Sequence, residues 1–345
     1  MIATRILRRP RVLIVGCGDV GLRCVEQWRA RRGNPRIVAL TSHPARRNEL
    51  RAAGATPIVG NLDRPETLAR IAGLARTILH LAPPQPDGAE DRRTRALVAA
   101  LTARARRPSR PPASVTGRLR IGRAAARSAG SPLQVARIVP DGLRAPRLVY
   151  ASTSGVYGDC GGAWIDETHP LCPANPRAYR RVSAERQLRA ATARGVLSAC
   201  IVRIPGIYAA NRLPVARLER GTPALDPADD VYTNHIHADD LAAILRNVAV
   251  RGKPSRAVHA SDDSVLRMGE YFDRVAHAVG LPPPPRVSRA EAERLLEPTL
   301  LSFMRESRRL RNARLKRELR VALRYPTVDD FLATLAHGGA SGQRR

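Results

Sequence analysis

Short apolar runs alternate with helical patterns through the first two thirds of the chain. The first apolar run covers residues 12–15, and comparable stretches cover residues 36–40, 56–59, 77–81, 148–152 and 199–203. Between them lie segments with the spacing of amphipathic helices, including residues 22–32 and 178–193. Strands that are apolar on both faces and alternate with helices are typical of a parallel, doubly wound α/β sheet.

Three glycines follow the first strand at once. Gly16, Gly18 and Gly21 have G-x-G-x-x-G spacing, and Asp19 and Val20 lie between the second and third of these glycines and belong to the same predicted site. In such a turn the first glycine allows the tight bend, the second lets the backbone approach a pyrophosphate, and the third lets helix and strand pack closely. The pattern predicts a Rossmann domain with a dinucleotide site here.

The end of the second strand indicates which dinucleotide. Thr41 and Ser42 stand there, and residues 34–47 contain no Asp or Glu to hold the ribose 2′-hydroxyl of NAD. Arg46 and Arg47 occupy the loop instead. A guanidinium can form paired bonds to a 2′-phosphate, so the loop favours NADP over NAD.

Ligands of doubly wound sheets lie at the carboxyl ends of the strands. The third and fourth strands therefore place five further residues near the adenine and ribose: Asn61, Leu62, Leu81, Ala82 and Pro83.

The length of 345 residues suits a Rossmann domain with a smaller lobe. We expect an NAD(P)-binding domain over residues 1–206, a C-terminal substrate lobe over 207–335 and a flexible tail over 336–345. Residues 104–147 contain 11 arginines and the single acid Asp141, which predicts a disordered insertion. A basic arm for nucleic acid or an anionic membrane is the alternative.

The net charge of +29 suggests nucleic acid at first sight. However, only two of the 59 basic residues are lysines, so the scattered arginines reflect a compositional bias of the chain. Aromatic residues, on which bases would stack, make up only 3% of the chain, and we therefore expect no specific nucleic-acid partner.

No apolar run reaches 18 residues, so we expect no membrane span. Five cysteines without C-x-x-C spacing predict reduced thiols in the cytoplasm.

Five motifs occur in order: VLIVGCGDVG, LHLAPP, LVYASTSGVYGD, RIPGIY and NHIHADDLA. With them the chain resembles the extended short-chain dehydrogenase/reductase superfamily, and within it the atypical bacterial NAD(P)-dependent epimerase/dehydratase branch. The resemblance implies a small-molecule substrate with a reacting hydroxyl or keto group, for which a sugar nucleotide is one candidate. It also places Ser152 and Pro205 beside the cofactor.

The resemblance nominates Thr153 and Tyr179 as catalytic residues. Thr153 precedes Tyr157 by four positions, as the residue holding the reacting oxygen does in the superfamily, and Tyr179 stands where the Tyr of Y-x-x-x-K is expected. Ser183 replaces the lysine, and no Y-x-x-x-K occurs anywhere in the chain. Without a nearby ammonium a phenol keeps a pKa of about 10 and is a poor base. A catalytically silent NADP-binding sensor is therefore the alternative function.

By the same resemblance, seven residues line the substrate cleft: Ser154, Tyr157, Arg203, Tyr208, Asn234, His235 and His237. The two histidines lack the further ligands that zinc requires, so we expect no metal. Residues 289–323 have an amphipathic pattern that predicts a helix.

Overall fold

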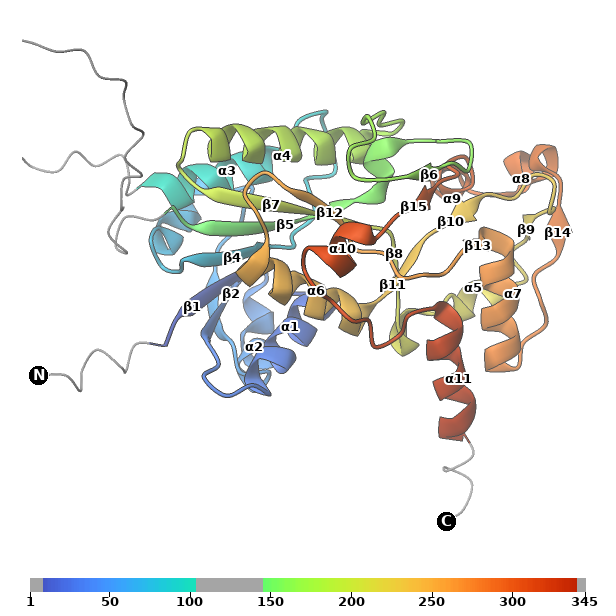
Figure 1. Cartoon of the computed structure of the whole chain (residues 1–345), viewed down its shortest axis with the longest axis horizontal. Coiled ribbons are helices and arrows are strands. Elements are labelled where there is room, and N and C mark those ends of the chain that lie inside the picture. Colours follow the sequence, from blue (N-terminus) through green and yellow to red (C-terminus); the bar gives the residue numbers. More distant parts are fainter. Residues whose placement is uncertain (1–8, 104–144, 340–345) are drawn as a thin grey trace, which may run out of the picture.

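The computed structural model describes residues 9–103 and 145–339. Its centre is a seven-stranded parallel sheet in the order β12-β7-β5-β4-β1-β2-β3 (Figure 1). The strands are β1 (Arg11–Val15), β2 (Arg36–Thr41), β3 (Thr56–Val59), β4 (Thr77–His80), β5 (Arg147–Thr153), β7 (Ser198–Ile204) and β12 (Ala257–His259). The strand order reverses beside β1, which is where such sheets bind ligands. The expected α/β fold is confirmed.

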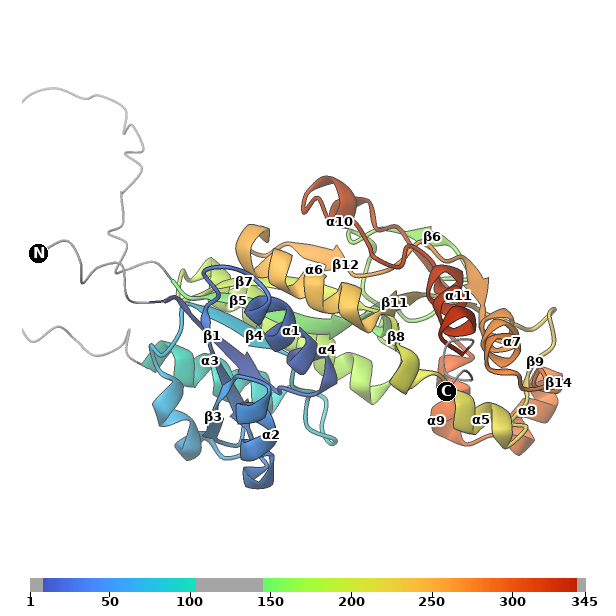
Figure 2. The same cartoon turned by 90° about the horizontal axis from the view of Figure 1, so that it is seen from below.

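Helices cover both faces of the sheet (Figures 1 and 2). Helices α1 (Asp19–Arg29) and α6 (Ala238–Arg251) pack on one face, and α3 (Arg92–Thr102) and α4 (Pro176–Ala193) pack on the other. Successive residues of β1 point to opposite faces, so Val12 and Ile14 join the core under α1 and α6, while Leu13 and Val15 join the core under α3 and α4. Helix α2 (Arg47–Ala52) follows β2.

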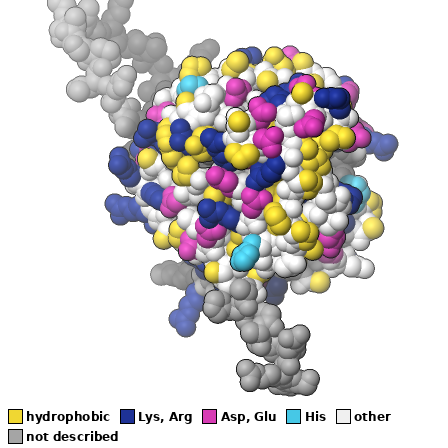
Figure 3. Space-filling view, turned by 90° about the vertical axis from the view of Figure 1, so that its right-hand side faces the viewer, with side chains coloured by type: hydrophobic (Ala, Val, Ile, Leu, Met, Phe, Trp, Pro, Cys, Tyr) yellow, Lys and Arg dark blue, Asp and Glu magenta, His cyan; other side chains and the backbone are white. Residues whose placement is uncertain are grey.

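The smaller lobe is built mainly from segments that follow β7, together with β6 (Trp164–Ile165) from before it. Its core joins α5 (Val215–Glu219), α7 (Met268–Val279) and α11 (Val328–Gly339) through Leu218, Phe272 and Phe331. Four two-stranded pairs complete it: β8 (Gly206–Tyr208) with β11 (His235–His237), β9 (Ala224–Leu225) with β14 (Arg286–Val287), β10 (Tyr232–Thr233) with β13 (Leu266–Arg267), and β6 (Trp164–Ile165) with β15 (Arg309–Leu310). At this end of the molecule basic and acidic side chains are interspersed (Figure 3).

Two expectations about the C-terminal part were wrong. Residues 289–323 do not form one helix but are divided into α8 (Arg289–Leu295), α9 (Pro298–Phe303), β15 and α10 (Ala313–Arg317). Pro298 cannot continue α8, and pairing of Arg309 and Leu310 with β6 holds the next segment extended. Residues 336–339 belong to α11 rather than to a tail. Of the insertion, residues 104–144 lie outside the described residues.

Candidate active site

The glycine-rich turn has the backbone geometry that the sequence predicts. Gly16 has a φ of 81°, and a Cβ there would lie 2.5 Å from the backbone nitrogen of Ala82, so only glycine fits. Gly18 has no atom within 4 Å of an added Cβ, which leaves its backbone open to a ligand. At Gly21 a Cβ would come within 3.1 Å of Cys17 Sγ, so a larger residue would crowd the packing of α1 on β1.

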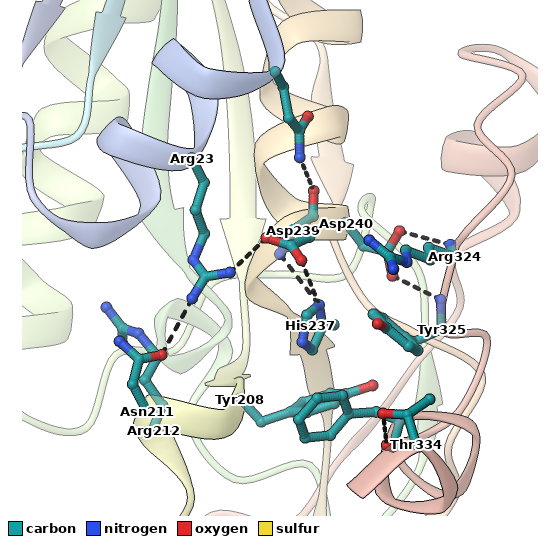
Figure 4. A network of polar contacts seen from close by, with 12 residues as sticks. Arg23, Tyr208, Asn211, Arg212, His237, Asp239, Asp240, Arg324, Tyr325 and Thr334 are labelled. Atoms are coloured by element: carbon teal, nitrogen blue, oxygen red, sulfur yellow. Dashed lines mark hydrogen bonds and ion pairs between the residues drawn. The ribbon is translucent and has the colours of Figure 1, made fainter. Parts of the chain in front are cut away.

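A network of polar and charged side chains connects α1 to α6 and to the residues that follow β8 (Figure 4). The Asp19 carboxylate accepts a hydrogen bond from Arg212 at 2.7 Å, and Arg23 bridges Asp19 to Asp239 of α6. Although partial burial opposes it, the bond from Arg212 and the charge of Arg23 lower the pKa of Asp19. The carboxylate of Asp19 is thus engaged within the protein, while the backbone N–H groups of the first helical turn have no intrahelical acceptor.

Residues at the end of β2 lie close to this turn. Arg46 donates at 2.8 Å to the carbonyl oxygen of Cys17, within the turn, and forms a two-bond ion pair with Glu49. Arg47 contacts the carbonyl oxygen of Pro44 and is exposed. Thr41 is buried and Ser42 is exposed.

The end of β4 adjoins the turn on the other side of β1, while β3 lies beyond β2. Ala82 and Leu81 both donate backbone hydrogen bonds to the carbonyl of Val15, which fixes them beside β1. Leu62 is buried, Asn61 accepts a bond from the backbone of Asp63, and the carbonyl of Pro83 accepts one from Arg93.

A cavity of about 400 Å³ opens at the carboxyl ends of β5 and β7. Its walls include Val20 of α1 and Leu81 after β4, residues 151–155, residues 204–207, and residues of the smaller lobe from Tyr232 to Asn234. Predicted site residues that line it are Val20, Leu81, Ser152, Thr153, Ser154, Pro205 and Asn234. The cavity therefore joins the predicted cofactor strand ends to the smaller lobe.

Thr153 closes strand β5 at this cavity. Its hydroxyl oxygen accepts a bond from the N–H of Gly155 at 3.3 Å, and that contact leaves the hydroxyl hydrogen available to another acceptor. Ser152 is committed differently, since its hydroxyl donates at 2.7 Å to the buried carboxylate of Glu185. Thr153 is thus the better placed of the two to bond a bound oxygen.

The family model for "NAD dependent epimerase/dehydratase family" matches residues 12–260, which include every strand of the central sheet from Val12 to His259. The chain belongs to the NAD-dependent epimerase/dehydratase family. Members of this family use NAD, and the resemblance inferred from the motifs is confirmed.

Individual relatives agree with this assignment. The chain is 30% identical over 152 residues to a 2′-dehydrokanamycin reductase of Streptomyces kanamyceticus, a match that covers 39% of this chain and only 42% of the reductase. It is also similar to a conserved protein of unknown function from Silicibacter pomeroyi, with 26% identity, a TM-score of 0.71 and coverage of 96% and 99% of the two chains. A dTDP-glucose 4,6-dehydratase of Bacillus anthracis, solved with NAD, shares the fold at 14% identity, with a TM-score of 0.68 and 97% of both chains covered.

In this member of the epimerase/dehydratase family, Tyr179 does not face the cavity. Its side chain is 51% exposed and lies against the segment from Pro86 to Ala89, away from Thr153. The Ser183 hydroxyl accepts a bond from the backbone of Asp91 and another from Gln187, so it is used in packing α4 on α3. The expected tyrosine–serine pair therefore lies on the wrong side of α4.

Two arginines on α4 face the cavity instead. Arg177 and Arg181 are four residues apart, the same spacing as the tyrosine and lysine of Y-x-x-x-K, and both line the cavity. One Arg181 amino group donates at 2.7 Å to the carbonyl oxygen of Ala151 and at 3.2 Å to the hydroxyl of Tyr150. Arg180 lies on the other side of α4, where its guanidinium donates at 2.9 Å to the carbonyl oxygen of Gly88.

Five residues expected in the cleft are buried behind it. Arg203 forms an ion pair at 2.8 Å with Glu185 and donates at 2.6 Å to the hydroxyl of Tyr157, which itself contacts His259 at 2.5 Å. Burial raises the pKa of Tyr157 to about 12. The prediction that Arg203 and Tyr157 line the cleft is wrong, because this network fills the space between β5, β7 and α4.

Tyr208, His235 and His237 are likewise buried in the smaller lobe. His235 stacks on Tyr271 with ring centroids 4.3 Å apart, and His237 Nδ1 accepts the N–H of Asp239 as the N-cap of α6. Burial lowers the pKa of His235 to about 3 and that of His237 to about 4, so both are neutral. They are core residues and not cleft residues. Within the described ranges, no cluster of three or more His, Cys, Asp or Glu could hold a metal ion.

Several cavity residues lay outside the motifs examined in the sequence. They are Asn175, Arg177, Arg181, Tyr232, Thr233, Ser302, Phe303, Glu306 and Arg308. The i, i+4 spacing of Arg177 and Arg181 is a signal that the sequence does contain. For Glu306 and Arg308 no local signal exists, because they approach β5 from about 150 residues away.

Among the described residues, no helix is long and apolar enough to cross a bilayer.

Proposed function

We propose that this protein transfers a hydride between NADP and a hydroxyl or keto carbon of a small molecule, with sugar nucleotides as the first substrate class to test. The position of Thr153 carries the proposal. Its hydroxyl lies at the carboxyl end of β5, in a cavity bounded on one side by the predicted cofactor strands and on the other by the smaller lobe. A substrate between the two would have its reacting oxygen within reach of this hydroxyl.

The turn after β1 fits a dinucleotide. Gly18 presents bare backbone, and the first-turn N–H groups of α1 are free to bind a pyrophosphate at the positive end of the helix. When bound, the nicotinamide supplies the hydride acceptor or donor. The protein's own part is to hold the substrate oxygen and stabilise the negative charge that develops on it.

The preference for NADP rests on Arg46. Its guanidinium lies at the glycine-rich turn through the bond to Cys17, where a 2′-phosphate at the end of β2 would come close. Glu49 competes for the same guanidinium. Binding of a 2′-phosphate therefore requires Arg46 to exchange a carboxylate partner for a phosphate partner.

Thr153 and Arg181 would share the work at the reacting oxygen. Thr153 can donate its hydroxyl hydrogen to the substrate oxygen, and Arg181, held by the Ala151 carbonyl, adds positive charge beside β5. A guanidinium stays protonated at every physiological pH, so it stabilises an alkoxide without exchanging a proton with it. The proton that the hydroxyl loses on oxidation, or that the alkoxide gains on reduction, is exchanged with water in the cavity. The protonated phenol of a standard dyad is replaced by fixed positive charge.

The alternative is a protein that binds NADP without catalysing a reaction. The observation that favours it is the exposure of Tyr179, which leaves the cavity without the phenol at the position where the superfamily uses one. The two hypotheses agree on the cofactor and differ on turnover. Cofactor binding and hydride transfer must therefore be measured separately.

The cofactor test compares two glycine substitutions by calorimetry with NADPH and NADH. Gly18→Ala adds a methyl group that meets no protein atom within 4 Å, so it should leave the melting temperature unchanged yet weaken NADPH binding about tenfold or more by blocking the pyrophosphate. Gly33→Ala, beyond the other end of α1, also meets no atom; its φ of 70° makes alanine strained there, so this variant should lose some stability but bind NADPH as the wild type does. Equal binding by both variants would refute the site.

Turnover is tested with Thr153→Val, which keeps the shape and removes the hydroxyl. Nicotinamide absorbance is followed with NADP⁺ or NADPH and a panel of sugar nucleotides. A loss of kcat of about a hundredfold with unchanged NADPH affinity would support hydride transfer at Thr153. Cofactor binding with no turnover of any panel member would favour the silent protein.

A further inference from the structure

The cavity wall has an excess of positive charge. Three arginines line it, Arg177 and Arg181 from α4 and Arg308 from the smaller lobe, together with the single acid Glu306. Glu306 is nine-tenths buried and already has two partners, Arg308 at 2.9 Å and the Asn175 side chain at 3.1 Å. One carboxylate is thus set against three guanidinium groups, and it is bonded to one of them.

Arg308 and Arg181 both have hydrogen-bond acceptors within the protein. Arg308 is 9% exposed and donates to the Gly158 carbonyl as well as to Glu306, but its buried Nε has no hydrogen-bond partner. Arg181 donates to the Ala151 carbonyl, and its buried Nε is also without a partner. Both guanidinium groups are thus held in place by carbonyl oxygens of the protein, and they add fixed positive charge to the cavity wall.

Arg177 has the fewest partners. Within the described part of the chain, no acceptor or carboxylate lies in bonding distance of its guanidinium, which stacks on the ring of Phe303 with Cζ 4.6 Å from the centroid. Partial burial lowers the pKa of Arg177; Glu306 opposes this, and Arg181 and Arg180 add to it. The guanidinium is thus held at the cavity by an aromatic ring while its hydrogen-bond donors remain available.

The place of Arg177 in its helix is unfavourable without a ligand. It is the second residue of the 18-residue helix α4, after the N-cap Asn175 and Pro176, and the first turn contains no acidic residue. The N-terminus of a helix carries partial positive charge, so a cation there is destabilising and an anion is stabilising. An anion in the cavity would be favoured at once by Arg177 and by the end of α4.

This anion would lie next to the reacting centre. A Cβ built at Gly155 would be 3.7 Å from Thr153 Oγ1 and 3.8 Å from Glu306 Oε2, so both side chains flank the same glycine. Glu306 in turn connects through Asn175 to the first turn of α4. The arginine wall therefore begins within a few ångströms of Thr153.

We propose that the substrate carries a carboxylate beside the hydroxyl or keto carbon that reacts, and that Arg177 binds this carboxylate. The substrate class is then a hydroxy or keto acid, which includes sugar acids. This inference rests on the proposed function only for naming Thr153 as the reacting end. Planar guanidinium and carboxylate groups match in paired hydrogen bonds, so an arginine at this position is suited to bind a carboxylate.

The test uses two pairs of probes that differ by one carboxylate. UDP-glucuronate is compared with UDP-glucose, and D-glucuronate with D-glucose, by calorimetry on the full chain with and without NADP⁺. We expect the acid of at least one pair to bind about 10- to 100-fold more tightly than its neutral partner, the range for a charge-assisted pair. If no acid binds better than its neutral partner at millimolar concentration, the proposal is overturned.

Variants assign the preference to Arg177. Arg177→Gln should abolish it and Arg177→Lys should keep part of it, while Arg186→Gln, which removes an exposed charge from the same helix outside the cavity, should leave it unchanged. Equal weakening of UDP-glucuronate and UDP-glucose by Arg177→Gln would mean that Arg177 binds the diphosphate, and would overturn the proposal. Acid preference in a protein that binds no NADP would instead refute the proposed function alone.

Discussion

Substitution of one partner of the buried ion pair between Glu185 and Arg203 should strongly lower the free energy of unfolding. Glu185 lies on α4 and Arg203 near the end of β7, with side chains only 1% and 3% exposed. Arg203 donates to Glu185 at 2.8 and 3.2 Å, to the Tyr157 hydroxyl at 2.6 Å and to the Glu167 carbonyl at 3.1 Å. The pair connects the helix that carries the cavity arginines to the sheet.

We expect Glu185→Gln to lower the free energy of unfolding by about 3–5 kcal/mol, because it leaves the guanidinium of Arg203 buried without a counter-charge. Bond counting gives a similar figure, since two charge-assisted bonds of about 1.5–3 kcal/mol each are weakened. The urea midpoint, followed by circular dichroism, should fall by about 1 M or more.

Two controls separate this reasoning from a general loss of charge. Glu293→Gln breaks an exposed pair with Arg305, whose side chains are 47% and 61% exposed, and should change stability by less than about 0.5 kcal/mol. The double variant Glu185→Leu, Arg203→Met should lose less than Glu185→Gln, because it leaves no unpaired charge. If Glu185→Gln costs no more than Glu293→Gln, the argument from buried charge is refuted.

Three further outcomes follow from the site. Tyr179→Phe should leave kcat within about twofold of the wild type, since the phenol lies outside the cavity. A nearly complete loss of kcat would show instead that Tyr179 takes part in catalysis. Glu49→Gln should tighten NADPH but not NADH binding about three- to tenfold in calorimetry by releasing Arg46, whereas equal effects on both would contradict a 2′-phosphate contact. Burial raises the pKa of Asp262 to about 7, so between about pH 4 and 7 the folded state holds more protons than the unfolded state and stability falls as pH rises. Asp262→Asn should remove this fall, and urea midpoints of both proteins at about pH 5.5 and about pH 8 check it.

The sequence by itself determined the sheet and its cofactor end. The apolar run of β1 and the glycines after it act over about ten residues, and the φ of 81° at Gly16 favours glycine whatever residues surround the turn. Because parallel strands end on one edge, locating the strands was enough to bring Leu81, Thr153 and Pro205 to one cavity.

Only the tertiary structure decided which side of α4 faces that cavity. The inward positions of this helix include the charged residues Arg180 and Glu185, so an apolar stripe does not mark its inner face. Glu185 is held there by Arg203 of β7, a partner that helix periodicity cannot reveal. That packing turns Arg177 and Arg181 toward Thr153 and Tyr179 toward solvent.

The smaller lobe shows the same limit over a longer distance. Glu306 and Arg308 reach the cavity through the pairing of β15 with β6, two strands of two residues each, whose short apolar content gives no periodic signal. Burial likewise decided that His235 and His237 are neutral core residues, since desolvation lowers their pKa values only once the lobe has closed around them. Local backbone chemistry thus determined the glycine-rich end of the sheet, and long-range packing determined the charge of the cavity beside Thr153.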